Sequence, residues 1–95
     1  MSKSYKEKMN EYRTSIDRLD TVLIYTLGER FQQTNKIGKI KAENNLPTQD
    51  YDRELHQIKK IRSTATAANL DPTFAAKIFD MIISEVKVNH DKMKK

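Results

Sequence analysis

An uninterrupted helical pattern near the N-terminus is the feature that most constrains this chain. From Tyr5 to about Ala42 there is no proline, and apolar residues recur in helical steps of three and four. A helix of roughly 36 residues would be about 54 Å long, whereas a compact domain of this chain length is only roughly 30 Å across. One chain cannot cover such a helix. We therefore expect two copies to pack along an apolar seam.

The size and composition of the chain also favour an oligomer. The 95 residues form one domain at most, spanning 1–95, which is short for a stable core. With no cysteine and only two isolated histidines, the fold cannot be stabilised by a disulfide or a structural metal, and we expect no cofactor. The absence of cysteine and of a long apolar run predicts a cytoplasmic protein that does not contact membranes. Such a short chain should also be monofunctional.

Two further helices follow the long one. The polar stretch 43–49 contains the first proline and is typical of a connection between helices. Asp50 is a good N-cap for a helix over about 50–68, and Asp71-Pro72 marks the start of another over about 72–93. No strand pattern is present. The predicted fold is all-α, with three helices per chain, a long first helix at about 5–42, and an intertwined homodimer.

The positive charge is the first indication of a ligand. A net charge of +5 suits an anionic partner, although solvated termini account for much of it. Those terminal charges are Lys3, Lys6, Lys8, Lys87, Lys92, Lys94 and Lys95.

Two cations within the helical pattern are harder to assign to solvent. At seven-residue intervals the seam of the long helix contains Arg30 among apolar residues, namely Met9, Ile16, Leu23 and Ile37. Lys41 lies about three turns beyond Arg30 on nearly the same face. Pairing with a carboxylate or snorkelling to solvent would explain both residues, and an anion-binding site is the functional alternative.

Arg13 could serve the same site only from another chain. It lies roughly 25 Å along the helix from Arg30 and about 100° away in rotation. An antiparallel pair of long helices would bring Arg13 of one chain to Arg30 of the other. A surface salt bridge explains Arg13 equally well on composition alone.

The later helices contain a second group of candidates. Asp50 and Glu54 lie four residues apart with Arg53 beside them, and ordinary capping or first-turn charges would account for all three. His90 follows Val86 by one turn and is therefore expected to face inward. A core or interface histidine is the simplest explanation for it.

Taken in order, the motifs have a joint pattern. They are Arg13-x-x-Ile16-Asp17-x-x-Asp20, Glu29-Arg30, Ile37-Gly38-x-x-Lys41, Leu46-Pro47, Asp50-x-x-Arg53-Glu54, Leu70-Asp71 and Phe79-x-x-Ile82-Ile83. This pattern resembles the small all-helical (AroQ-type) chorismate mutases. The resemblance implies a dimer of three-helix chains that rearranges chorismate to prephenate in aromatic amino-acid biosynthesis. Such a one-step pericyclic reaction needs no nucleophile, metal or cofactor.

The resemblance also implies roles for four cations. Arg13 from the partner chain and Arg30 would hold the substrate carboxylates, and Lys41 would reach a carboxylate and the ether oxygen. Arg53 would support this charge network. Such cations can position the reactive conformer and stabilise the negative charge that grows on the ether oxygen.

The remaining assignments include two departures from the family pattern. By resemblance, Glu54 and the nearby Asp50 would engage the ring hydroxyl. Val86 stands where some members have a serine that contacts substrate, so a polar contact is missing or comes from elsewhere. His90 stands where a glutamine or glutamate often donates to the ether oxygen. We hypothesise that His90 is this donor, and that the rate rises when its ring is protonated.

Other activities remain open at this stage. Isochorismate-pyruvate lyase and amino-chorismate mutase use similar dianionic substrates on the same fold, but the intact Asp50-x-x-Arg53-Glu54 favours the hydroxyl-bearing chorismate. A dimeric helical module that binds nucleic acid or protein is a more distant alternative. The inward cations are too few for a surface that follows a nucleic-acid backbone, so no nucleic-acid partner is expected. A regulatory partner enzyme is not excluded.

Overall fold

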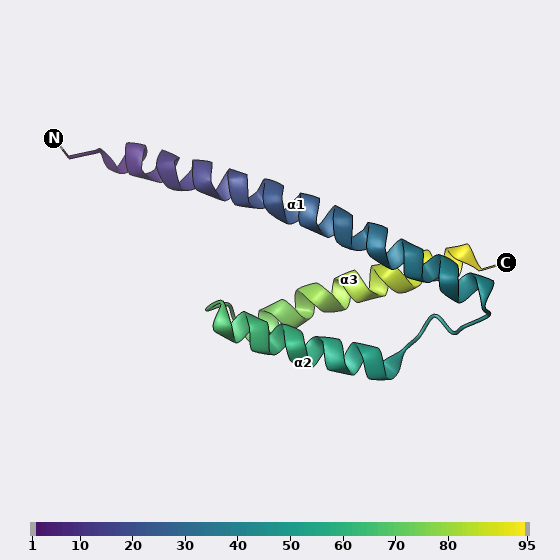
Figure 1. The fold of residues 1–95 in the computed structure, drawn as a ribbon. Coiled ribbons are helices and arrows are strands. Elements are labelled where there is room, and N and C mark those ends of the chain that lie inside the picture. The colour runs from purple at the N-terminus through teal and green to yellow at the C-terminus, as the bar shows by residue number, and fades with distance from the viewer. Residues whose placement is uncertain (1, 95) are drawn as a thin grey trace. The chain divides into compact units, whose positions relative to one another are not determined.

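A computed structural model describes residues 2–94 as three helices. They are α1 (Tyr5–Glu43), α2 (Tyr51–Ala67) and α3 (Pro72–Met93) (Figure 1). The all-α class with three helices and a long first helix is thus confirmed. Lys95, one of the terminal charges named above, lies outside the described residues. Contacts along the chain form two compact units, one ending at Gln33 and the other beginning at Thr34.

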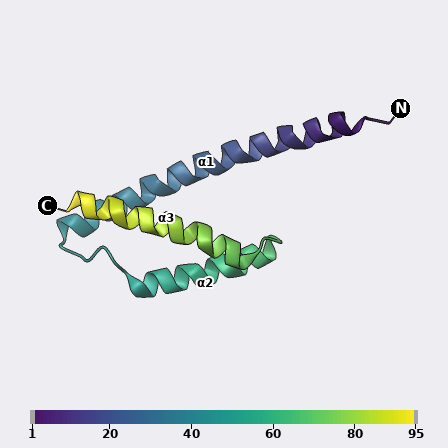
Figure 2. The same ribbon diagram turned by 180° about the vertical axis from the view of Figure 1, so that it is seen from behind.

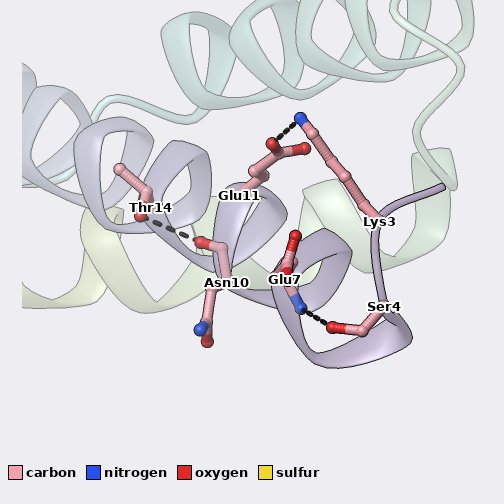
Figure 3. A network of polar contacts seen from close by, with 6 residues as sticks. All are labelled: Lys3, Ser4, Glu7, Asn10, Glu11 and Thr14. Atoms are coloured by element: carbon pink, nitrogen blue, oxygen red, sulfur yellow. Dashed lines mark hydrogen bonds and ion pairs between the residues drawn. The ribbon is translucent and has the colours of Figure 1, made fainter. Parts of the chain in front are cut away.

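Local interactions stabilise the beginning of α1. The Glu7 backbone N–H donates to Ser4 Oγ at 3.2 Å, which makes Ser4 the N-cap residue (Figure 3). Lys3 forms an ion pair with Glu11, and Thr14 Oγ1 donates to the Asn10 carbonyl at 2.9 Å. All of these groups are exposed, and exposed ion pairs contribute little to stability. The first turns of α1 are therefore held by neighbours in sequence.

The apolar face of α1 before Thr34 is largely exposed. On this face Tyr12 is 72% and Leu23 is 63% exposed, and Met9, Ile16 and Leu19 are also exposed. Tyr25, which is 78% exposed, lies on the other side of the helix, and Val22 and Ile24 are exposed as well. Helices in proteins gain most of their stability from packing, so this exposed face is a candidate for contact with another surface.

Helices α2 and α3 form an antiparallel hairpin, which both views show side by side (Figures 1 and 2). Its buried apolar residues are small: Ala65, Ala75 and Ala76 are at most 6% exposed. Small side chains let the two helix backbones approach closely. The hairpin therefore has a core within its own chain.

Asparagines end both α1 and α2. Asn45 and Asn69 have φ values of 53° and 58°, in the left-handed region that asparagine tolerates better than most residues. The residue after each asparagine donates its N–H back to the helix at 2.9 Å, from Leu46 to the Lys41 carbonyl and from Leu70 to the Ala65 carbonyl. This pattern is a Schellman cap, which satisfies carbonyls that would otherwise lack partners.

The C-terminal ends of α1 and α3 meet at Gly38. A Cβ atom on Gly38 would lie 2.6 Å from His90 Cδ2 and 2.6 Å from Met93 Sδ, so a larger residue would push α3 away. At the same contact, His90 Nε2 donates to the Thr34 carbonyl at 2.7 Å. Gly38 thus allows the end of α3 to pack directly on α1. Across residues 2–94, no helix has the length and apolarity needed to cross a membrane.

Candidate active site

Lys41 is held at the C-terminal end of α1. The side chain is half-buried, and its Nζ donates to the Thr48 carbonyl at 3.1 Å. Thr48 Oγ1 in turn donates to Asp91 Oδ1 at 2.7 Å, which ties the α1–α2 connection to the end of α3. An ammonium group has three N–H donors, so this one bond leaves donors available for a ligand.

Asp50 lies close to Lys41 at the start of α2. It is the N-cap residue, and its Oδ1 accepts from the Arg53 backbone N–H at 3.1 Å, as capping predicts. The side chains of Asp50 and Arg53 are both exposed. Asp50 and Lys41 line one shallow hollow, together with Leu46, Pro47, Gln49, Tyr51 and Asp52. The structure therefore brings a candidate cation and a candidate carboxylate to the same concave surface.

Glu54 is half-buried between the helices of the hairpin, with a hydrogen-bond donor on one carboxylate oxygen and an ion-pair partner beside the other. Gln49 Nε2 donates to Oε2 at 2.6 Å, and Lys87 Nζ lies 2.5 Å from Oε1. The assignment of Lys87 to the solvated terminal charges is therefore wrong. Lys87 lies well inside α3, and packing of α3 on α2 brings its ammonium to Glu54. The sequence did contain one indication of a role for Lys87. It directly follows Val86, the position at which a polar contact of the family is missing.

His90 is buried near the end of α3, with only 4% of its surface exposed. This agrees with the inward direction that its spacing predicts. Because a carbonyl only accepts, Nε2 carries the hydrogen in the bond to Thr34. Nδ1 is also buried and makes no hydrogen bond within residues 2–94. Val86, one turn earlier, is half-buried.

The described part of the chain contains no group of three or more His, Asp or Glu residues that could hold a metal.

Arg13 and Arg30 both lie on α1 before Thr34. Arg13 is exposed, and Arg30 is half-buried. A continuous helix separates these positions by roughly 25 Å, because each residue adds about 1.5 Å. Within one chain the two guanidinium groups therefore cannot contact the same small ligand.

Comparison with known proteins identifies the family. Residues 12–90 match chorismate mutase type II, and this range covers most of the chain. The chain belongs to this family. Membership confirms the resemblance inferred from the motifs and makes the activity that of a chorismate mutase, an isomerase.

Individual relatives within this family differ in how much of their length the chain matches. A chorismate mutase of Methanocaldococcus jannaschii is 30% identical over 81 residues, covering 85% of this chain and 82% of that protein. The bifunctional chorismate mutase/prephenate dehydratase of Escherichia coli K12 is 30% identical over 73 residues, covering 77% of this chain and 19% of that protein. A protein of the same bifunctional description from Buchnera aphidicola subsp. Schizaphis graminum is 25% identical over 88 residues, and the chain spans 23% of its length.

Proposed function

We propose that this chorismate mutase converts chorismate to prephenate as an intertwined homodimer whose active sites contain residues from both chains. The observation that carries the proposal is the extent of the family match. Residues 12–90 include every candidate site residue from Arg13 to His90. The position of the chain in aromatic amino-acid biosynthesis follows from the same membership.

The exposed face of α1 supports the homodimer. Tyr12, Ile16, Leu19 and Leu23 recur at helical spacing and are each more than half exposed in the single chain. A second copy has the same face, so the two can bury it symmetrically along their long helices. Arg13, which cannot reach Arg30 in its own chain, would then serve the site of the partner.

The chemistry required of this site is positioning and charge stabilisation. In the rearrangement the ether C–O bond breaks as a new C–C bond forms, and negative charge grows on the ether oxygen. Holding the reactive conformer can lower the barrier by about 7–11 kcal/mol. Fixed cations near the ether oxygen lower it further, because they are in place before the charge develops.

The cations divide between these two tasks. Arg13 of the second copy and Arg30 bind the substrate carboxylates, for which the planar guanidinium fork is suited. Lys41 binds a carboxylate and donates to the ether oxygen. Its bond to the Thr48 carbonyl supports this role, since it fixes the ammonium while leaving other donors available. Arg53 reinforces the positive potential from the exposed side of α2.

The carboxylates of α2 would bind the neutral part of the substrate. Glu54 accepts a hydrogen bond from the ring hydroxyl, and Asp50 supports it from the start of the helix. The partly buried position of Glu54 and its fixed orientation between Gln49 and Lys87 favour such a role. Val86 provides an apolar contact nearby.

His90 is proposed as a second donor to the ether oxygen, which requires that its ring turn. Its Nε2–H now donates to Thr34 and Nδ1 is buried, so the ring must turn when substrate binds. If it donates, turnover should be higher when both ring nitrogens carry a hydrogen, and it should therefore rise as the pH is lowered. The His90→Gln variant retains an amide donor and should remove the pH dependence while keeping activity. A flat wild-type profile and an unimpaired His90→Ala variant would exclude the role.

A direct assay tests the proposed function. Purified protein is incubated with chorismate, loss of the diene absorbance is followed, and the product is identified by chromatography. Prephenate is the expected product. If chorismate persists, isochorismate and the amino analogue are tested next, and turnover of only one of these would assign the site to the corresponding alternative reaction.

A further inference from the structure

A three-residue polar cluster at the hairpin has a charge balance that the family pattern does not predict. Gln49 precedes α2, Glu54 lies in its first turns, and Lys87 projects from α3. The Glu54 side chain is 20% exposed and that of Lys87 is 31% exposed. Lys87 Nζ and Gln49 Nε2 lie 2.5 Å and 2.6 Å from the two Glu54 oxygens. The carboxylate is therefore neutralised and oriented before any ligand arrives.

This pairing changes what Glu54 can recognise. Glu54 Oε1 is buried and accepts no hydrogen bond within residues 2–94, so it can still accept one from a ligand, and the Lys87 ammonium beside it has N–H groups to donate. A hydroxyl group both donates and accepts, so it can donate to Glu54 and accept from Lys87. A protonated amine only donates, and the positive charge of Lys87 repels it.

We propose that Lys87 is a specificity-determining residue that selects a ring hydroxyl over a ring amine in the substrate. The inference rests on the proposed function, in which Glu54 faces the ring hydroxyl of chorismate. Without Lys87, the Glu54 carboxylate would attract an alkyl ammonium, which is the charged form of such an amine at neutral pH. With Lys87 in place, the pair has no net charge and gives the ammonium no electrostatic advantage.

A purely structural role is the alternative, because the same ion pair also connects α2 to α3. The two roles differ in one measurable quantity. Loss of a structural tie lowers stability and affects both ligands alike, whereas loss of a specificity determinant changes their ratio. The Lys87→Met variant removes the charge and keeps the aliphatic chain, and Lys87→Arg keeps the charge. Lys77→Met is the matched control, since Lys77 is an exposed lysine of the same helix.

The experiment compares kcat/KM for chorismate with the inhibition constant of its amino analogue, in which an amine replaces the ring hydroxyl. We expect Lys87→Met to bind the amine about tenfold or more tightly relative to chorismate, as removal of a nearby like charge predicts. Lys87→Arg and Lys77→Met should keep the wild-type ratio. If Lys87→Met does not fold, Lys87→Gln provides the same loss of charge with a polar side chain.

The outcomes separate this inference from the function on which it rests. Wild-type protein that converts chorismate, combined with an unchanged ratio in Lys87→Met and Lys87→Gln, overturns the specificity role alone. Wild-type protein that converts neither chorismate nor the amino analogue overturns the proposed function and this inference with it. A ratio that shifts equally in Lys77→Met would assign the effect to general surface charge and would also overturn the role of Lys87.

Discussion

The part of α1 that ends at Gln33 exposes most of its apolar side chains, whereas the part of the chain that begins at Thr34 packs against itself. In the first, Leu23 and Tyr25 are 63% and 78% exposed; in the second, Ala65, Ala75 and His90 are at most 5% exposed. The same long helix thus passes from a stretch with local contacts only to a stretch that contacts α3. The first part therefore has an apolar surface but no buried residue among residues 2–33, whereas the second has a small buried core, although Tyr51 and Met81 there are also 76% exposed.

The largest effect is expected from a charge on the exposed face. Leu23→Glu should abolish dimer formation and reduce turnover below detection, because the charge would be buried between two copies and Arg13 would no longer reach a second chain. Light scattering after size-exclusion chromatography measures the oligomeric state. Thr21→Glu, on the opposite side of the helix, is the matched control and should remain dimeric. A monomeric wild-type protein with full activity would contradict the proposed assembly.

Loss of one site cation should strongly reduce turnover without affecting dimer assembly. Arg30→Ala and Lys41→Ala are each expected to lower turnover by about two orders of magnitude or more, as removal of a preorganised charge does elsewhere. Steady-state kinetics on folded, dimeric protein measures the effect. Lys39→Ala removes an exposed lysine two residues from Lys41 and should leave the rate nearly unchanged. Near wild-type turnover in either site variant would refute that residue's role.

Alanine substitutions at two glycines of α1 test the difference between the two parts of the chain directly. In Gly38→Ala, the new methyl group would collide with the His90 ring and Met93, so we expect a loss of about 1–3 kcal/mol in stability. Thermal unfolding should show this as a lower Tm.

The matched substitution is Gly28→Ala, since a Cβ on Gly28 meets no atom of the chain within 4 Å. Alanine should stabilise this helix position by about 0.8–1.0 kcal/mol through its higher helix propensity. A destabilised Gly28→Ala dimer would instead show that the second copy packs tightly against Gly28. That result would map the interface more finely.

The smallest effects are expected from the two N-cap residues of the hairpin. Asp71→Ala should cost about 1 kcal/mol by removing the bond to the Thr73 N–H, and it should leave kcat unchanged. Asp50→Asn keeps a good capping group and should retain stability, but it should lower kcat/KM if the charge of Asp50 supports substrate binding. Denaturant unfolding and kinetics on both variants separate the two roles. Equal kinetics in both would leave Asp50 as a cap alone.

Parts of the site were predictable from sequence because their signals are local. The Asp50 cap depends on a residue three positions away, and the inward direction of His90 follows from its spacing within one helix. The pairing of Lys87 with Glu54 was not predictable in this way. It depends on how α2 and α3 pack, and no periodicity within either helix specifies which of its charges will meet the other. The bond from His90 to the Thr34 carbonyl has the same origin.

The sequence by itself determined the three helices, the long first one among them, and the family to which the chain belongs. Helical periodicity, capping residues and motif order are properties of neighbouring positions, so they can be read without a structure. The tertiary structure decided which charges are neutralised and which side chains are buried. Those outcomes depend on contacts between residues far apart in sequence. Examples are the close packing of His90 on Gly38 and the ion pair between Lys87 and Glu54.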